Sequence, residues 1–232
     1  SATLCVLADG SGATESFRSQ IGSRLAVQAF RKVIEKEIFP IFKGDDLQLS
    51  QIEESWNQIG KKVENLWLED CLNHLLEEPF TEEENQIRLD HGDLIRRPIG
   101  AYTTTLSGAL LTQKYGLFLH LGDAEVMITQ RSGDTESISD SATAATQTAI
   151  ILGSSHRLPF HPRVISGPDW AEKELVSLAT DGVRDAFPDR EDLARHVVGY
   201  LNAWRNKGSH KKLSTLTRDP CLRFAGASGC GG

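Results

Sequence analysis

Leu4-Cys5-Val6-Leu7-Ala8-Asp9-Gly10 is an apolar run near the start of the chain that ends in an Asp-Gly turn. The same arrangement returns much later, in Leu175-Val176-Ser177-Leu178-Ala179-Thr180-Asp181-Gly182. Each run is typical of a buried strand, and each leads into a segment with helical character. A strand end holds a carboxylate rigidly, and glycine allows close approach of backbone or ligand. Two such ends brought together would offer the oxygen ligands that Mg²⁺ and Mn²⁺ prefer, although an isolated Asp-Gly is usually only a turn.

Two further motifs lie between these turns, Thr103-Thr104-Thr105-Leu106 and Leu121-Gly122-Asp123-Ala124-Glu125. In this order the segments resemble the metal-dependent serine/threonine phosphatases of type 2C. The pattern of that family runs Ala-Asp-Gly, Gly-Thr-Thr-Leu, Gly-Asp-Ser-Arg and Ser-Asp-Gly-x-x-Asp. Its last motif corresponds here to Thr180-Asp181-Gly182-Val183-Arg184-Asp185. The resemblance covers the chain from its first residue to the end of this motif.

Two departures from the family pattern are visible. Ala124-Glu125 stands where the family has Ser-Arg. Ser11-Gly12-Ala13-Thr14 follows the first Asp-Gly in place of the common Gly-Gly-His, and it looks like the bacterial branch that reads Asp-Gly-Ala-Gly.

The order of elements favours an α+β fold, because helices near both ends of the chain flank a meander of strands. The resemblance sharpens this to a four-layer sandwich, in which two antiparallel β-sheets pack face to face with helices on both outer sides. Strands are expected near 3–8, 102–112, 117–121, 124–130, 149–152, 163–166 and 174–180, with another after the turn at 131–134. The strands at 3–8 and 174–180 should end close together, with the carboxylates of Asp9 and Asp181 within about 10 Å.

Helices are expected from Ser19 to about Phe42, from a capping box formed by Ser50 and Glu53, and from about Asp189. The buried stripe of the second helix is expected at Ile52, Trp56, Ile59, Val63, Leu66, Leu72 and Leu76, and that of the last helix at Leu193, Val197, Leu201 and Trp204. Residues 79–100 are polar, carry two prolines and are expected to form a long surface loop.

The resemblance implies a metal centre with two Mn²⁺ or Mg²⁺ ions, or three. Asp9 would bridge two ions, the carbonyl of Gly10 would ligate one, and Asp181 would ligate the other. Asp123 matches the residue that helps to hold a weaker third ion in some members, with Asp185 expected near it; a plain Gly-Asp hairpin turn is the alternative for Asp123. Thr104 and Thr105 are expected to support the site through hydrogen bonds.

The implied activity is hydrolysis of phosphoserine and phosphothreonine in proteins by a metal-bridged water, which needs no covalent nucleophile. Asp9 and Asp181 would then be the catalytic residues, phosphoproteins the substrates and signalling the context. The alternative is a catalytically inactive relative that binds and regulates a protein partner.

The family also has an acidic ligand on a strand before the first Asp-Gly and a late Asp before a final strand. This chain begins at Ser1 and carries no acid after Asp219. We therefore expect residues 1–232 to form a single phosphatase-like domain without its first and last strands, with weak activity for that reason, or a member that has lost both ligands.

Composition agrees with a globular protein of 232 residues, with 39% hydrophobic and 25% charged residues. A net charge of −7 and a pI near 5.5 argue against binding of nucleic acid. No apolar run reaches the length of a membrane span, so a membrane is not expected as a partner either.

The cysteines, which are Cys5, Cys71, Cys221 and Cys230, match no zinc-binding spacing. Cys5 and Cys71 lie in expected regular elements, where a thiol is usually a small buried apolar group. Reduced thiols and a cytoplasmic location are therefore expected, and a disulfide between Cys221 and Cys230 is the alternative for the glycine-rich tail.

Overall fold

The computed structural model describes residues 2–43, 48–138, 152, 160–207 and 222–226. By its contacts the chain divides into two compact units. The first comprises Ser1–Leu7, Ser107–Gln147 and Arg163–Gly232, and we call it the sheet unit. The second comprises Ala8–Leu106 and Thr148–Pro162, and we call it the helical unit.

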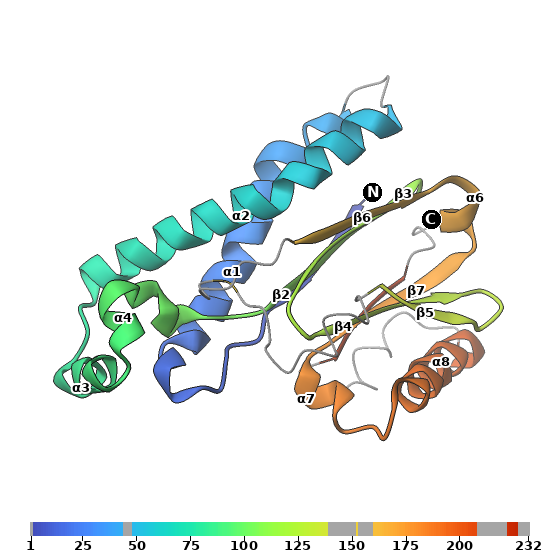
Figure 1. Cartoon of the computed structure of the whole chain (residues 1–232). Coiled ribbons are helices and arrows are strands. Elements are labelled where there is room, and N and C mark those ends of the chain that lie inside the picture. Colours follow the sequence, from blue (N-terminus) through green and yellow to red (C-terminus); the bar gives the residue numbers. More distant parts are fainter. Residues whose placement is uncertain (1, 44–47, 139–151, 153–159, 208–221, 227–232) are drawn as a thin grey trace. The chain divides into compact units, whose positions relative to one another are not determined.

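The described strands of the sheet unit form two four-stranded sheets (Figure 1). One has the order β1 (Ala2–Leu7), β2 (Leu106–Thr112), β3 (Tyr115–Leu121) and β6 (His161–Ser166). The other has the order β5 (Thr135–Ser137), β4 (Glu125–Gln130), β7 (Lys173–Ala179) and β8 (Leu222–Gly226). The pairings β1–β2, β4–β5, β4–β7 and β7–β8 are antiparallel.

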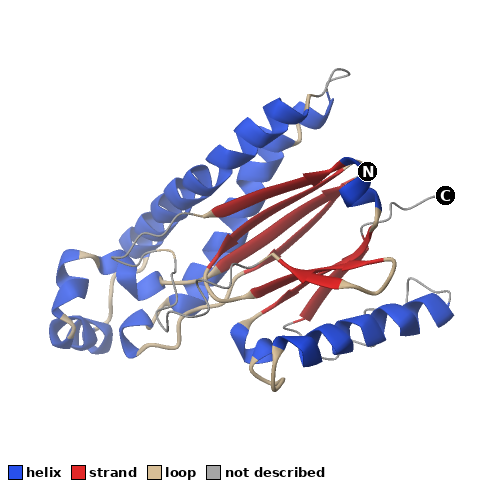
Figure 2. Ribbon diagram, turned by 45° about the vertical axis from the view of Figure 1, so that its right-hand side comes forward, coloured by secondary structure: helices blue, strands red, loops and turns tan. Residues whose placement is uncertain are grey.

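The two sheets pack face to face over a shared apolar core, and Figure 2 shows them as two red layers. Because side chains alternate along a strand, Val176 and Leu178 of β7 face this core while Leu175 faces the other way. The core is completed from both sheets by Ala109, Leu111, Phe118, Val126, Ile128 and Ile165, with Trp170. Leu7 of β1 packs against the same core.

The last helix, α8 (Arg190–Lys207), covers the outer face of the β4–β7 sheet. Its residues Leu193, Val197 and Leu201 pack on Met127 and Leu175, which are the outward-facing side chains of β4 and β7. The expected α+β class with two antiparallel sheets is confirmed.

The helical unit is built on two long helices, α1 (Ser19–Val33) and α2 (Leu49–Glu77), which run side by side in Figure 1. A π-helical turn, η2 (Ile34–Ile38), continues α1. The indole of Trp67 donates a hydrogen bond of 2.9 Å to the carbonyl of Gly22. Phe30 and Trp56 meet edge to face in the core between the helices.

Two expectations about α2 are wrong. The helix begins at Leu49 without a side-chain cap, so Ser50 and Glu53 form no capping box. Its buried stripe passes through Trp67 and Cys71, and Leu72 and Leu76 are exposed. A period of 3.6 residues places Trp67 and Cys71 in line with Val63, whereas Leu72 and Leu76 fall on the next face.

The expected loop at 79–100 is also wrong, because the segment is largely helical. It contains α3 (Glu82–Asp90), α4 (Gly92–Arg96) and the start of η4 (Pro98–Tyr102). A capping box does form here, between Thr81 and Glu84.

Four short helices complete the description: η1 (Thr14–Ser16), η3 (Ile41–Lys43), α6 (Gly167–Ala171) and α7 (Asp181–Arg184). Cys5 and Cys71 are free thiols. The described residues do not include Asp219, Cys221, Cys230 or most of the strand expected at 149–152, and the side chain of Trp204 is not described either. None of the described helices is long and apolar enough to span a membrane.

Candidate metal centre

Asp9 follows β1, and hydrogen bonds hold both its backbone amide and its backbone carbonyl. Its carbonyl accepts hydrogen bonds of 2.8 Å from the amide of Thr105 and from the hydroxyl of Thr104. Its amide donates to the hydroxyl of Thr105 over 3.0 Å. Both threonines are buried. They therefore fix the position from which the half-buried Asp9 side chain projects.

Gly10 is required by the close approach of α1. A Cβ atom at this position would lie 2.8 Å from the backbone carbon and oxygen of Ser19, which cannot move aside without displacing the helix. The next residue, Ser11, donates its amide to the carbonyl of Thr103 over 3.2 Å. The loop after Asp9 is thus fastened to the Thr103–Thr105 segment on one side and to the start of α1 on the other.

Asp123 and Asp181 are brought together by the register of the sheet unit. The pairing of β4 with β7 ends at Glu125 and Ala179, so Asp123, two residues before Glu125, and Asp181, two residues after Ala179, leave the sheet at the same end. Gly122 has a φ of 115°, a backbone conformation that favours glycine and turns the chain before Asp123. Burial, and then the negative charge of Asp181, raise the pKa of the Asp123 carboxyl above its usual value.

Arg184 braces this pair of acids, and sequence reasoning missed it. Its Nη1 donates to the carbonyl of Asp123 over 2.9 Å, and its Nε donates to Oδ1 of Asp185 over 2.9 Å. The amide of Asp185 donates to the carbonyl of Asp181 over 2.7 Å, which closes the turn. Arg184 lies inside the Thr180–Asp185 motif, but the motif draws attention only to its acids.

Glu125 shows how the departure from the family's Ser-Arg is accommodated. Its side chain is buried at 1% exposure, where it accepts a hydrogen bond from the Ser137 hydroxyl. One of its oxygens lies 3.0 Å from Nε of Arg190, the first residue of α8. The acid therefore ties β4 to β5 and α8, which is a structural role.

The acids of this turn region are of the chemical type that binds a hard divalent cation. Asp123, Asp181 and Asp185 lie near the guanidinium of Arg184, and burial, followed by the negative charge of Asp181, raises the pKa of Asp123. Carboxylate oxygens are the ligands that Mg²⁺ and Mn²⁺ prefer. Among the residues that the structure describes, no three His, Cys, Asp or Glu side chains form a ready ligand set. Asp9 and Gly10 belong to the helical unit and the other acids to the sheet unit, so a shared centre stays a prediction.

Comparison with known proteins identifies one family. The sequence model described as Protein phosphatase 2C matches residues 1–217. A search of the curated proteins gave no match.

Several solved structures share the fold. A bacterial serine phosphatase is 14% identical, with 99% of this chain and 87% of that chain covered and a TM-score of 0.59. The serine/threonine phosphatase PstP/Ppp of Mycobacterium tuberculosis is 16% identical, with coverage of 95% and 86% and a TM-score of 0.53. The catalytic domain of PstP in complex with two manganese ions is 17% identical, with coverage of 95% and 84% and a TM-score of 0.52.

Proposed function

Because the chain belongs to the protein phosphatase 2C family of serine/threonine phosphatases, we propose that it hydrolyses phosphoserine and phosphothreonine in proteins with the help of manganese or magnesium ions. The match of the family model to residues 1–217 is the observation that carries this proposal. The manganese ions in the similar PstP catalytic domain support the choice of metal. A cytoplasmic location and a role in signalling stay predictions.

Five residues would hold the ions in this proposal. Asp9, the carbonyl of Gly10 and Asp181 would bind two ions, and Asp123 with Asp185 would bind a weaker third. When bound, such ions lower the pKa of a water molecule and neutralise charge on the phosphoryl oxygens. The hydrolysis then needs no covalent nucleophile from the protein.

The chain's own residues supply rigidity to this chemistry. Thr104 and Thr105 hold the backbone of Asp9, so the position from which its side chain projects is set before an ion arrives. Arg184 holds the Asp123 turn and the Asp185 carboxylate, and its positive charge limits the repulsion among the acids. Supports of this kind commonly change metal affinity or activity by about 10–100-fold when removed.

Hydrolysis of a phosphothreonine peptide tests the proposal. The complete natural protein with Mn²⁺ should release phosphate, and the release should stop when the metal is chelated; residues 1–232 alone should be far less active or inactive. Asp9→Asn should lower the rate by several orders of magnitude, because it removes the bridging charge. Asp169→Asn, at an exposed acid of α6 outside the motifs, is the matched control and should leave the rate unchanged. A complete natural protein that is folded but shows no turnover would favour the partner-binding alternative.

Metal binding can be measured separately from activity. Calorimetry should show Mn²⁺ binding to the wild type and weaker binding to Asp181→Asn. Equal binding by both proteins would show that Asp181 is only a turn residue.

A further inference from the structure

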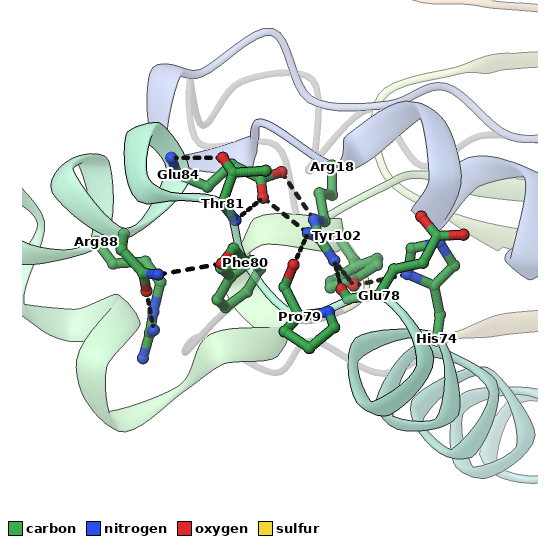
Figure 3. Close-up of polar contacts among 10 residues, drawn as sticks. Arg18, His74, Glu78, Pro79, Phe80, Thr81, Glu84, Arg88 and Tyr102 are labelled. Atoms are coloured by element: carbon green, nitrogen blue, oxygen red, sulfur yellow. Dashed lines mark hydrogen bonds and ion pairs between the residues drawn. The ribbon is translucent and has the colours of Figure 1, made fainter.

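The guanidinium of Arg18, just before α1, is buried and fully engaged (Figure 3). Its Nε and Nη2 donate to the two carboxylate oxygens of Glu84 over 2.8 and 2.7 Å. The remaining donors reach the carbonyls of Glu78 and Pro79 and the hydroxyl of Tyr102. A bidentate pair with its other donors satisfied has one geometry, so Arg18 locks the connection between α2 and α3 in place.

Aromatic rings complete the surroundings of Arg18. Its guanidinium lies 4.6 Å from the centre of the Phe80 ring, which is a cation–π distance. The Tyr102 hydroxyl that Arg18 reaches also lies 3.0 Å from Nδ1 of His74, near the end of α2. Tyr102 is completely buried. Arg18 thus joins α2, the α2–α3 connection and η4 at a single side chain.

A ladder of hydrogen bonds runs from Arg18 to Asp9. The amide of Arg18 donates to the carbonyl of Ala101 over 2.8 Å. Further along, the hydroxyls of Ser16 and Thr103 are 2.5 Å apart, and the Ser11 amide bonds Thr103. The ladder ends in the bonds between Asp9 and the Thr104–Thr105 pair. The loop that carries Asp9 is therefore fastened along the 101–105 segment, from the backbone amide of Arg18 to Asp9. The guanidinium of Arg18 holds the same segment through the hydroxyl of Tyr102.

We propose that Arg18 is a positioning residue for the phosphatase site, which sets the Asp9 loop by locking the α2–α3 connection onto Tyr102. The proposal rests on the function assigned above. Arg18 acts through the 101–105 segment and does not itself touch metal or substrate. Because all its donors are used within the protein, it is not the group that binds the phosphate.

Arg88 provides a matched control. Its guanidinium lies 4.8 Å from the centre of the same Phe80 ring, and its Nη1 donates to Asn85. No described contact joins Arg88 to the 101–105 segment. Arg88→Gln therefore removes an arginine from the same aromatic ring without touching the ladder.

The experiment compares Arg18→Gln, Glu84→Gln and Arg88→Gln by Mn²⁺ calorimetry and by hydrogen exchange of the metal-free proteins. Arg18→Gln should weaken Mn²⁺ binding by about tenfold or more. It should also speed exchange at the amides of Asp9, Ser11 and Thr105, each of which donates a bond of the ladder. Glu84→Gln should produce a smaller change of the same kind, and Arg88→Gln should match the wild type.

A core variant separates positioning from loss of stability. Val63→Ala truncates a completely buried side chain of α2 and should destabilise the protein without faster exchange confined to the Asp9 loop. The proposal would be overturned if hydrogen exchange at the amides of Asp9, Ser11 and Thr105 in Arg18→Gln were the same as in Val63→Ala or in Arg88→Gln. If the wild type binds no Mn²⁺ or hydrolyses no phosphopeptide, the proposed function fails, and the exchange data still decide the role of Arg18.

Discussion

Asp123 carries a negative charge that the folded protein disfavours in the absence of a cation. Burial and the nearby Asp181 raise its pKa, so ionisation of Asp123 costs stability. The sign follows from the shift: the cost is absent below the unfolded pKa of about 3.8 and is complete above the folded pKa. Groups kept in an unfavourable charge state are common at functional sites.

Asp123→Asn should therefore stabilise the metal-free protein at pH 7. We expect the melting temperature to rise by a few degrees, because the neutral amide removes the cost of burying the charge and then the repulsion from Asp181. The gain should shrink as the pH is lowered toward 3.5, where Asp123 itself is protonated. Thermal melts at pH 7 and pH 3.5 measure this change in melting temperature, with Asp169→Asn as the control. A lower melting temperature for Asp123→Asn than for the wild type at pH 7 would contradict the prediction.

Among the described glycines of the helical unit, Gly22 has the least room for a side chain. A Cβ atom there would lie 1.8 Å from the carbonyl oxygen of Tyr102, so α1 and η4 would have to separate. Gly22→Ala should lower the free energy of unfolding by about 3 kcal/mol or more. Gly12→Ala, where nothing lies within 4 Å, should change it by less than about 1 kcal/mol. Urea unfolding of the two variants gives the comparison, and similar values for both would contradict the close approach.

At the scale of elements, α3 is fastened by polar contacts at its N-terminal end. None of its residues is fully buried, and Ile87 is half-buried. The Thr81 hydroxyl accepts from the Glu84 amide over 3.2 Å, and the Glu84 carboxylate accepts from the Thr81 amide over 2.9 Å. The same carboxylate binds Arg18. A polar cap and one ion pair therefore fix the start of α3.

Thr81→Ala should cost about 1 kcal/mol, as is usual for loss of an N-cap. Hydrogen exchange should become faster within α3, while Glu83→Gln, at an exposed neighbour in the same turn, should leave it unchanged. Exchange in α3 that does not respond to Thr81→Ala would show that Arg18 alone holds the helix.

These contacts explain which elements the sequence could predict. The strands and α1 bury apolar side chains at regular spacing, and that pattern is readable without a structure. The segment 79–100 is polar and contains Pro79 and Pro98, so it shows no regular apolar spacing. Its first helix begins at a capping box and is bound by Arg18, and neither contact produces such a pattern. A tertiary partner 66 positions away leaves no local signal.

The candidate site divides in the same way. Asp9 and Asp181 stand out because each ends an apolar run in an Asp-Gly turn. Arg184 and Arg18 do not, since their importance lies in the carbonyls and carboxylates that folding brings to them. Charge at the ends of strands is visible in a sequence, but the groups that brace it become visible only in three dimensions.

At the scale of the whole molecule, acid should destabilise the protein. The hydrogen bond from Arg18 lowers the pKa of Glu84, and the hydrogen bond from Lys62 lowers that of Glu37. For a carboxyl with a lowered folded pKa, the contribution is complete above the unfolded pKa of about 4.5 and is lost as the pH falls through the folded pKa. The urea concentration at the unfolding midpoint should therefore decrease when the pH is lowered below 4.5. Glu84→Gln should weaken this dependence of the midpoint on pH. The same dependence in Glu84→Gln as in the wild type would show that Glu84 does not cause it.

The tryptophans offer a separate optical probe for each unit. Trp56 and Trp67 are completely buried in the helical unit, and Trp170 is 3% exposed in the sheet unit. With Trp204 replaced by Phe, a protein that keeps only Trp170 reports on the sheet unit, and one that keeps only Trp56 and Trp67 reports on the helical unit. Fluorescence melts that coincide would describe one cooperative transition, whereas melts that separate would show that either half of the molecule can lose its structure while the other remains folded.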